Sequence, residues 1–183
     1  MIEEYKIAID RYIETIKGIP IDAAHEHTYR TPLENLINSI KFPTLNITPI
    51  HEGKDKKLDI DGTPDFFIYK DENTLFKTLI GFIECKKIMF NIDSIISSEQ
   101  IAKYSKTSEN IIITNYREFI LLQKGTIKNR VKILLDDLSI TGDSNAYQNL
   151  INLFLDFYGY EYQYIKTKKS LITALASQSF YYS

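Results

Sequence analysis

The sequence predicts one α/β domain, with a mixed central sheet of about five strands, helices on both faces of the sheet, and a candidate site at one sheet edge. Three observations predict this class. Short apolar runs typical of strands alternate with segments of helical periodicity. A chain of 183 residues fills one core but is too short for two ordinary domains. No internal repeat or long linker interrupts the pattern, so residues 1–183 are expected to form a single domain.

The first half of the chain is predicted to form two helices followed by three strands. Apolar residues recur at helical spacing from the N-terminus until Gly18 and Pro20 end the pattern. Thr31 and Pro32 are typical of a helix start, as an N-cap and a first-turn residue. The third strand is apolar almost throughout, which is typical of a strand buried on both faces. The expected elements are helices at 2–17 and 31–40, a strand at 44–50, a strand at 66–69 with a turn at 71–73, and a strand at 78–85.

The second half is predicted to add a helix, further strands and two closing helices. The most apolar of these helices carries large side chains at helical spacing, which is typical of a helix packed into the core. In order, the expected elements are a helix at 97–105, strands at 111–114, 118–123 and 131–135, a helix at 146–158 and a last helix from about residue 168. The chain stops in an aromatic run at Ser183, from which we expect it to be a segment of a longer polypeptide.

Composition narrows the class of protein. The chain is 44% hydrophobic and 25% charged, which is typical of a folded protein. No signal peptide or membrane span is visible, so an intracellular, cytoplasmic protein without a membrane partner is expected. A single cysteine, Cys85, excludes an internal disulfide and a cysteine-rich zinc site. The net charge of −2 argues against a protein that only coats nucleic acid, but it agrees with carboxylates clustered around a cation.

The candidate chemistry surrounds the third predicted strand. Asp65 follows Pro64, and 18 residues separate it from Glu84, which precedes Cys85 and Lys86. Because side chains alternate along a strand, Glu84 and Lys86 are expected on one face and Cys85 on the other. Two converging carboxylates form a hard-oxygen site suited to Mg²⁺ or Mn²⁺. Such a metal polarises a phosphoryl oxygen and acidifies an attacking water, which Lys86 can orient or deprotonate.

Chance is the competing explanation of this trio. Acidic residues are common at strand ends, and a Glu-x-Lys pair recurs in many chains. Glu84 and Lys86, however, lie at the end of the otherwise apolar run 79–83. Charges are expensive to desolvate in such a place unless they have partners or a function. The placement therefore favours a functional site.

Three further residues have two interpretations each. Glu34 is either the third residue of a capping box that begins at Thr31, or an additional carboxylate of the site on an N-terminal helix. Gln100 and Tyr104 are four positions apart, so both can face the site from one side of a helix. The alternative places Tyr104 in the core and Gln100 at the surface.

Among the histidines, His25 and His27 are interpreted as polar residues of a loop, and His51 as a residue able to contact phosphate.

Five blocks of sequence keep one order and spacing between Tyr29 and Lys124. They are Tyr29 to Leu36, Thr63 to Phe66, Gly81 to Lys86, Glu99 to Tyr104 and Ile113 to Phe119. Together they resemble the nuclease domains of type I and type I single-polypeptide restriction enzymes, within the PD-(D/E)xK superfamily. The resemblance implies a restriction-endonuclease-like fold and Mg²⁺-dependent hydrolysis of DNA phosphodiester bonds. It also implies that residues 1–183 are the N-terminal part of a larger polypeptide, with helicase or methyltransferase modules as partners in the same polypeptide or complex.

The resemblance assigns a role to each matched position. Asp65, Glu84 and the backbone carbonyl of Cys85 become metal ligands, and Lys86 becomes the catalytic lysine. Glu34 becomes the helix carboxylate, and Gln100 and Tyr104 fall on a Gln-x3-Tyr motif that assists cleavage. Cys85 departs from the small aliphatic residue usual between Glu and Lys, although only its carbonyl is needed. Two alternatives stay open: a nuclease-like module that binds DNA or protein without cutting, and a stand-alone repair or recombination nuclease.

Overall fold

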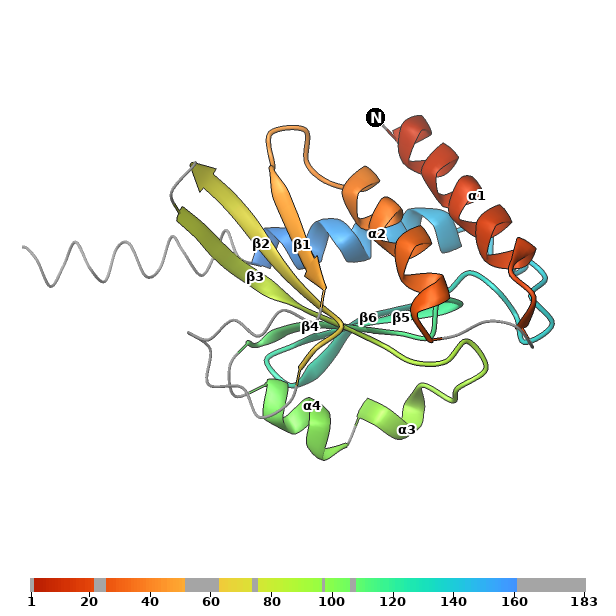
Figure 1. Ribbon diagram of the computed structural model, residues 1–183. Helices are drawn as coiled ribbons and strands as arrows, with labels where there is room; N and C mark the ends of the chain where they lie inside the picture. Colours follow the sequence, from red (N-terminus) through yellow and green to blue (C-terminus); the bar gives the residue numbers. More distant parts are fainter. Residues whose placement is uncertain are drawn as a thin grey trace, which may run out of the picture.

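The computed structural model describes residues 2–21, 26–51, 63–73, 76–96, 98–105 and 108–160, and it shows a sheet of six strands between two layers of helices (Figure 1). The predicted α/β class is confirmed, with six strands where about five were expected. The helices are α1 (Ile2–Gly18), the 3-10 helix η2 (Glu26–Tyr29), α2 (Arg30–Ser39), α3 (Asp93–Ile96), α4 (Glu99–Tyr104) and a helix over residues 146–160. The strands are β1 (Ile47–His51), β2 (Phe66–Asn73), β3 (Phe76–Cys85), β4 (Asn110–Thr114), β5 (Glu118–Gln123) and β6 (Thr126–Lys132).

The strands follow one another across the sheet in chain order, from β1 to β6. All neighbours are antiparallel except β3 and β4, which run in parallel. Parallel neighbours need a crossover connection, and here the crossover carries α3 and α4. The carboxyl ends of β3 and β4 therefore lie side by side, with the crossover starting from one of them.

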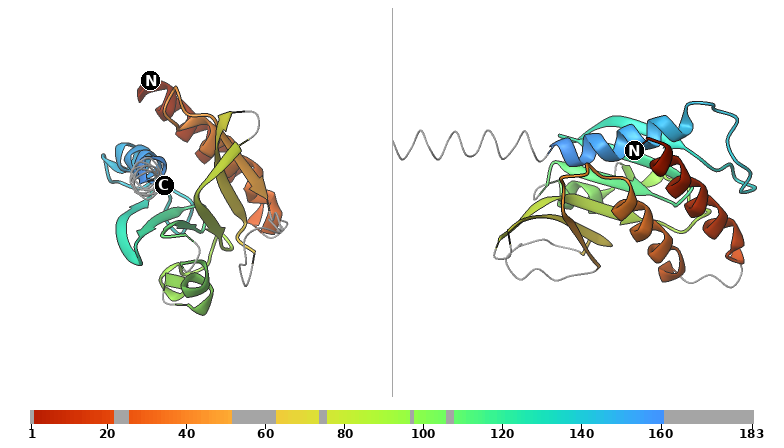
Figure 2. Two further views of the ribbon diagram at one scale, coloured as in Figure 1. Left: turned by 90° about the vertical axis from the view of Figure 1, so that its left-hand side faces the viewer. Right: turned by 90° about the horizontal axis from the view of Figure 1, so that it is seen from above.

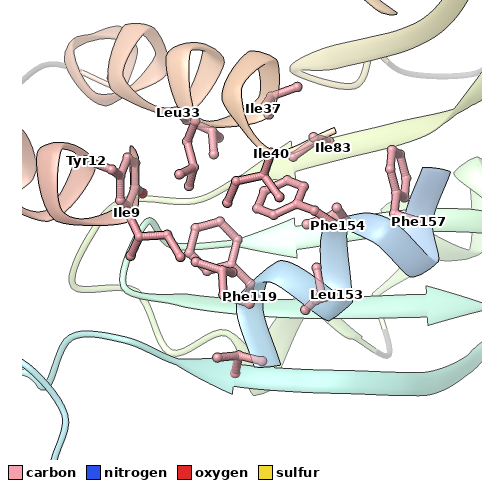
Figure 3. Packing of buried hydrophobic residues seen from close by; sticks show 14 of the residues in the cluster. Ile9, Tyr12, Leu33, Ile37, Ile40, Ile83, Phe119, Leu153, Phe154 and Phe157 are labelled. Atoms are coloured by element: carbon pink, nitrogen blue, oxygen red, sulfur yellow. The ribbon is translucent and has the colours of Figure 1, made fainter. Parts of the chain in front are cut away.

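Each face of the sheet has its own apolar core. In β2, Phe66 and Ile68 point to one core, whereas Phe67 and Tyr69 point to the other, as the two-residue period of a strand requires. The first core is covered by α1, α2 and the helix over residues 146–160, which lie together when the molecule is seen from above (Figure 2). Figure 3 shows Phe119 of β5 and Phe154 meeting inside this core, where their ring centroids are 5.9 Å apart. The second core is covered by α3 and α4.

Gly81 and Asn110 fix β3 against its neighbours. A Cβ atom at Gly81 would lie 2.2 Å from the backbone oxygen of Asn110, so only glycine allows this approach. The buried Asn110 amide donates to the carbonyls of Ile80, at 3.1 Å, and Phe157, at 2.8 Å. One side chain thus joins β3, β4 and the helix over residues 146–160, which sets the position of the carboxyl end of β3.

Several expected boundaries are wrong. β2 does not turn at residues 71–73 but runs to Asn73, which pairs with Phe76. The side chain of Asp71 accepts a hydrogen bond from Thr48 of β1, at 2.7 Å, so this residue is part of the sheet and not of a turn. The last strand is β6 and not residues 131–135; it is an outer strand in which only Val131 is buried. Helix α3 was not predicted. The helix expected from residue 168 and the side chains of His25 and His27 lie outside the described part of the chain.

Among the described helices, none combines the length and apolar character needed to cross a membrane.

Candidate functional site

Asp65 and Glu84 meet at the point where β2 begins and β3 ends. Phe66 pairs with Ile83 in the antiparallel register, so the residue before one and the residue after the other are neighbours. The backbone N–H of Cys85 donates to Asp65 Oδ2 at 2.7 Å. Asp65 is 7% exposed and Glu84 is 3% exposed. The predicted pair is therefore brought together, on two inner strands of the sheet and not on an outer one.

Lys86 and Gln100 complete a hydrogen-bonded cluster on Glu84. Lys86 Nζ donates to Glu84 Oε1 at 2.8 Å and to Gln100 Oε1 at 3.1 Å. Gln100 Nε2 donates to Glu84 Oε1 and to the Tyr104 hydroxyl, each at 2.8 Å. The expectation that Glu84 and Lys86 share a face is thus confirmed. The surface interpretation of Gln100 is wrong, because its amide joins both charged residues.

Tyr104 has both of the roles considered for it. Its ring is fully buried in the second core, with its centroid 6.0 Å from that of Phe82. Its hydroxyl nevertheless accepts the hydrogen bond from Gln100. Ser98 caps the short helix α4 by accepting from the N–H of Ile101, so the helix begins just before Gln100. Packing of Tyr104 against the sheet therefore aims the Gln100 amide at Glu84.

Cys85 points to the opposite face of the sheet, as its place between Glu84 and Lys86 predicts. Its side chain belongs to the first core and lies beside the Tyr116 hydroxyl. Burial, followed by the negative charge of Asp65, raises the pKa of the Cys85 thiol well above its usual value. The thiol is therefore a neutral core group and not a nucleophile.

The capping-box interpretation of Glu34 is wrong. Helix α2 begins at Arg30, one residue before Thr31, and its N-cap residue Tyr29 makes no side-chain capping bond. Glu34 Oε2 instead lies 2.7 Å from His51 Nε2 at the end of β1. The His51 ring packs on Phe66, the residue after Asp65, with ring centroids 4.4 Å apart. Glu34 and His51 thus flank the start of β2.

Arg30 is the site residue that the sequence interpretation missed. Its Nη2 forms an ion pair with Asp65 Oδ1, and the side chains of the two residues are 8% and 10% exposed. Arg30 stands within the first block of the resemblance, but no role was attached to it. Its signal in the sequence is weak because the pairing spans 35 positions and follows no local period.

The electrostatics of the site centre on Glu84. Burial, together with the negative charge of Asp65, raises the pKa of the Glu84 carboxyl, while Lys86 acts in the opposite direction. Glu84 Oε2 is buried and has no hydrogen-bond partner. A buried acceptor without a partner is unfavourable, and in a folded protein it calls for a ligand or a functional reason.

The donor set fits a hard divalent cation. Among the described residues, no group of three or more His, Cys, Asp or Glu side chains is placed to hold a metal. The ligands that the resemblance implies are Asp65, Glu84 and the Cys85 carbonyl. Mg²⁺ commonly uses one or two carboxylates and keeps several waters, so two carboxylates suffice. The unpartnered Glu84 oxygen agrees with this fit, whereas the guanidinium of Arg30 on Asp65 opposes it.

The backbone after Lys86 is held by the turn between β4 and β5. Thr114 O accepts from the N–H of Lys86 at 2.8 Å. The side chain of Asn115 donates to Phe90 O at 2.8 Å, and Nε of Arg117 donates to Ile88 O at 2.7 Å. The fifth block of the resemblance, around Thr114 to Glu118, therefore supports the site by fixing the segment that carries Lys86.

The comparisons with known proteins identify the fold. No family model matches the chain, and no curated protein matches it. Among solved structures, one chain of the cryo-electron-microscopy structure of a DrdV–DNA complex is similar, with a TM-score of 0.58 and 22% sequence identity. The similarity covers 84% of this chain and 96% of that one. At this identity the likeness shows a shared fold.

Proposed function

We propose that the chain is a Mg²⁺-dependent endodeoxyribonuclease domain that hydrolyses DNA phosphodiester bonds in the cytoplasm, as part of a restriction-modification system. The observation that carries the proposal is the cluster of Lys86 and Gln100 on Glu84 Oε1, next to Asp65, with the second oxygen of Glu84, Oε2, buried and without a hydrogen-bond partner. The DNA in the structure of the similar fold supports the choice of substrate. Mn²⁺ is expected to substitute for Mg²⁺, because both prefer oxygen ligands.

Each residue of the cluster has a distinct task in this proposal. Asp65, Glu84 and the Cys85 carbonyl would hold the cation, which when bound supplies Lewis-acid polarisation of the phosphoryl oxygen and a more acidic water. A lysine ammonium has three N–H donors, and Lys86 directs two of them to Glu84 and Gln100. The third is left for the attacking water or for the charge that develops on phosphate. Gln100, oriented by Tyr104, keeps Lys86 in this position.

A binding module that does not cut DNA is the second candidate. It is favoured by the ion pair between Arg30 and Asp65, which places a positive group on a proposed metal ligand. A titration with Mg²⁺ or Mn²⁺ separates the two functions, because only the nuclease requires the cation. Helicase or methyltransferase modules, the partners expected for a restriction system, are tested by reading the gene beyond the codon for Ser183.

The nuclease is tested best at Lys86. Replacing Asp65 with alanine would leave the buried Arg30 and the Cys85 N–H without their acceptor, so a loss of activity there could reflect misfolding. Lys86 is partly exposed, and in Lys86→Ala Glu84 Oε1 keeps its hydrogen bond from Gln100. We expect this variant to cut a supercoiled plasmid in Mg²⁺ about 100-fold more slowly or worse than wild type. Lys87→Ala, which removes the exposed neighbouring lysine, is the matched control and should cut normally.

Equal cutting by wild type and Lys86→Ala would contradict the proposal. Absence of cutting by wild type, together with absence of Mg²⁺ or Mn²⁺ binding, would favour the binding module. A circular dichroism spectrum and a Tm for each variant show whether the fold is intact.

A further inference from the structure

Arg30 and Asp65 form a buried ion pair inside the proposed metal site. Arg30 is the first residue of α2, and its guanidinium reaches Asp65 Oδ1, while Asp65 Oδ2 accepts from the Cys85 N–H. Both oxygens of this carboxylate are therefore engaged by groups of the chain itself. On the neighbouring carboxylate, Glu84, one oxygen is engaged and the other has no partner.

The charge of Arg30 opposes that of a metal ion at the same carboxylate. A guanidinium keeps its positive charge at any accessible pH. A divalent cation on Asp65 would lie within a few ångströms of it, at a place with little solvent to screen the repulsion. Each carboxylate oxygen has two lone pairs and can accept a second partner. The guanidinium and the cation therefore compete mainly through charge repulsion and less through steric exclusion.

We propose that Arg30 is an internal counter-ion that competes with the divalent cation for Asp65, and so sets how tightly the site takes up its metal. The inference rests on the proposed function, because it concerns the metal of that same site. It differs from a purely structural role in the sign of its effect. If Arg30 only held Asp65 in place, its removal would weaken metal binding. If it competes, its removal strengthens metal binding.

A negatively charged phosphate offers Arg30 an alternative partner. Arginine pairs well with phosphate, often through two parallel hydrogen bonds. When DNA occupies the site, its backbone can draw the guanidinium away from Asp65 and lower the competition. Arg30 would then couple metal uptake to DNA binding, and by thermodynamic reciprocity the metal would tighten DNA binding as well.

Calorimetric titration of the whole chain with Mn²⁺ tests the sign. Arg30→Gln removes the charge, and we expect it to bind Mn²⁺ roughly tenfold more tightly than wild type. Arg130→Gln is the matched control: it removes an arginine that also pairs with a buried carboxylate, that of Glu118, on β5 and β6. Its Mn²⁺ affinity should equal that of wild type, which separates local competition from a general change in net charge.

Arg30→Lys keeps the measurement decisive if the glutamine variant fails to fold. Lysine retains the charge but lacks the planar fork, so it should hold Asp65 less well and bind Mn²⁺ two- to threefold more tightly than wild type does. Equal or weaker binding by the folded Arg30 variants overturns the counter-ion role while leaving the nuclease proposal intact. Absence of Mn²⁺ binding by wild type and all variants overturns both proposals.

Discussion

Two buried glutamates lie on the same face of the sheet and have very different surroundings. Glu118 Oε1 accepts from Arg130 Nε at 2.5 Å, and its Oε2 lies 3.8 Å from Lys132 Nζ. Arg130 also reaches Asp93 of α3, so this cluster ties β5 and β6 to a helix. Glu84 has two donors on Oε1 and none on the buried Oε2. Both are nearly inaccessible to water, at 6% and 3% exposure, so burial alone does not distinguish them.

The difference teaches how to separate a structural carboxylate from a functional one. At Glu118 the side chains that neutralise the charge also use both oxygens, so the cluster is complete within the chain. At Glu84 burial and the nearby Asp65 raise the pKa of the carboxyl, and one oxygen still lacks a partner. A protein retains such an unfavourable arrangement where a ligand offsets it. Between these two glutamates, unfilled hydrogen-bonding capacity is the difference, whereas burial is alike.

The largest expected effect comes from removing one charge from each cluster. Glu84→Gln should lower DNA cleavage on the order of 100-fold or more, because the charge that attracts the cation is lost. It should also abolish the rise in Tm that Mn²⁺ gives to wild type. Glu118→Gln should keep cleavage near the wild-type rate but lower the free energy of unfolding by about 1–3 kcal/mol, since a buried charge-assisted bond is weakened. Plasmid cleavage and urea unfolding measure the two quantities.

The proposed difference between Glu84 and Glu118 is contradicted if both variants lose cleavage to the same extent while remaining folded. It is also contradicted if Glu84→Gln retains the Mn²⁺-dependent rise in Tm, because the cation would then bind elsewhere.

A smaller effect is expected at Gln100, which has no counterpart in the Glu118 cluster. Gln100→Ala removes the amide that joins Glu84, Lys86 and Tyr104, and we expect cleavage to slow about tenfold because Lys86 loses its support. Steady-state kinetics should show the loss in kcat. Glu99→Ala, an exposed neighbour on α4, is the control and should leave kcat unchanged. A loss confined to KM would instead assign Gln100 to DNA binding.

The smallest effect concerns acid stability and belongs to the Glu118 side of the comparison. Hydrogen bonding to Arg130 lowers the pKa of the exposed Asp93 carboxyl below its usual 3.8. A lowered carboxyl pKa gives stability that is present above the unfolded-state value and is lost as the pH falls through the folded-state value. Asp93→Asn should therefore have a lower urea midpoint than wild type at neutral pH, with a difference that begins to shrink as the pH falls below about 3.8 and disappears below the lowered folded-state pKa. A difference independent of pH would exclude the ion pair as its cause.

The centre of the site could be predicted from the sequence because it follows local rules. The two-residue period of a strand places Glu84 and Lys86 together, and the four-residue spacing of a helix places Gln100 and Tyr104 together. Arg30 and the pairing of Glu34 with His51 could not be predicted, because each depends on how α2 packs against β1 and β2. Contacts across elements leave no periodic trace in a single sequence.

The fold shows the same division between local and long-range information. The apolar strand β3 and the helix over residues 146–160 were predicted because their apolar patterns are strong. β6 was misplaced because an outer strand buries little and leaves a weak pattern: of its seven residues only Val131 is buried. The missed α3 has only four residues, too few to show helical periodicity.

The shortness of α4 has a consequence for the lifetime of the assembled site. A helix of six residues is far too short to persist by itself in water, so α4 stays folded through the packing of Ile101 and Tyr104 on the sheet. Opening of this crossover alone would withdraw Gln100 from Lys86 while the sheet and the larger core remain native. Amide protons of α4 are therefore expected to exchange with deuterium before those of β3 and β4. The stability of this small unit, and not that of the whole domain, would then set the fraction of molecules in which the site is complete.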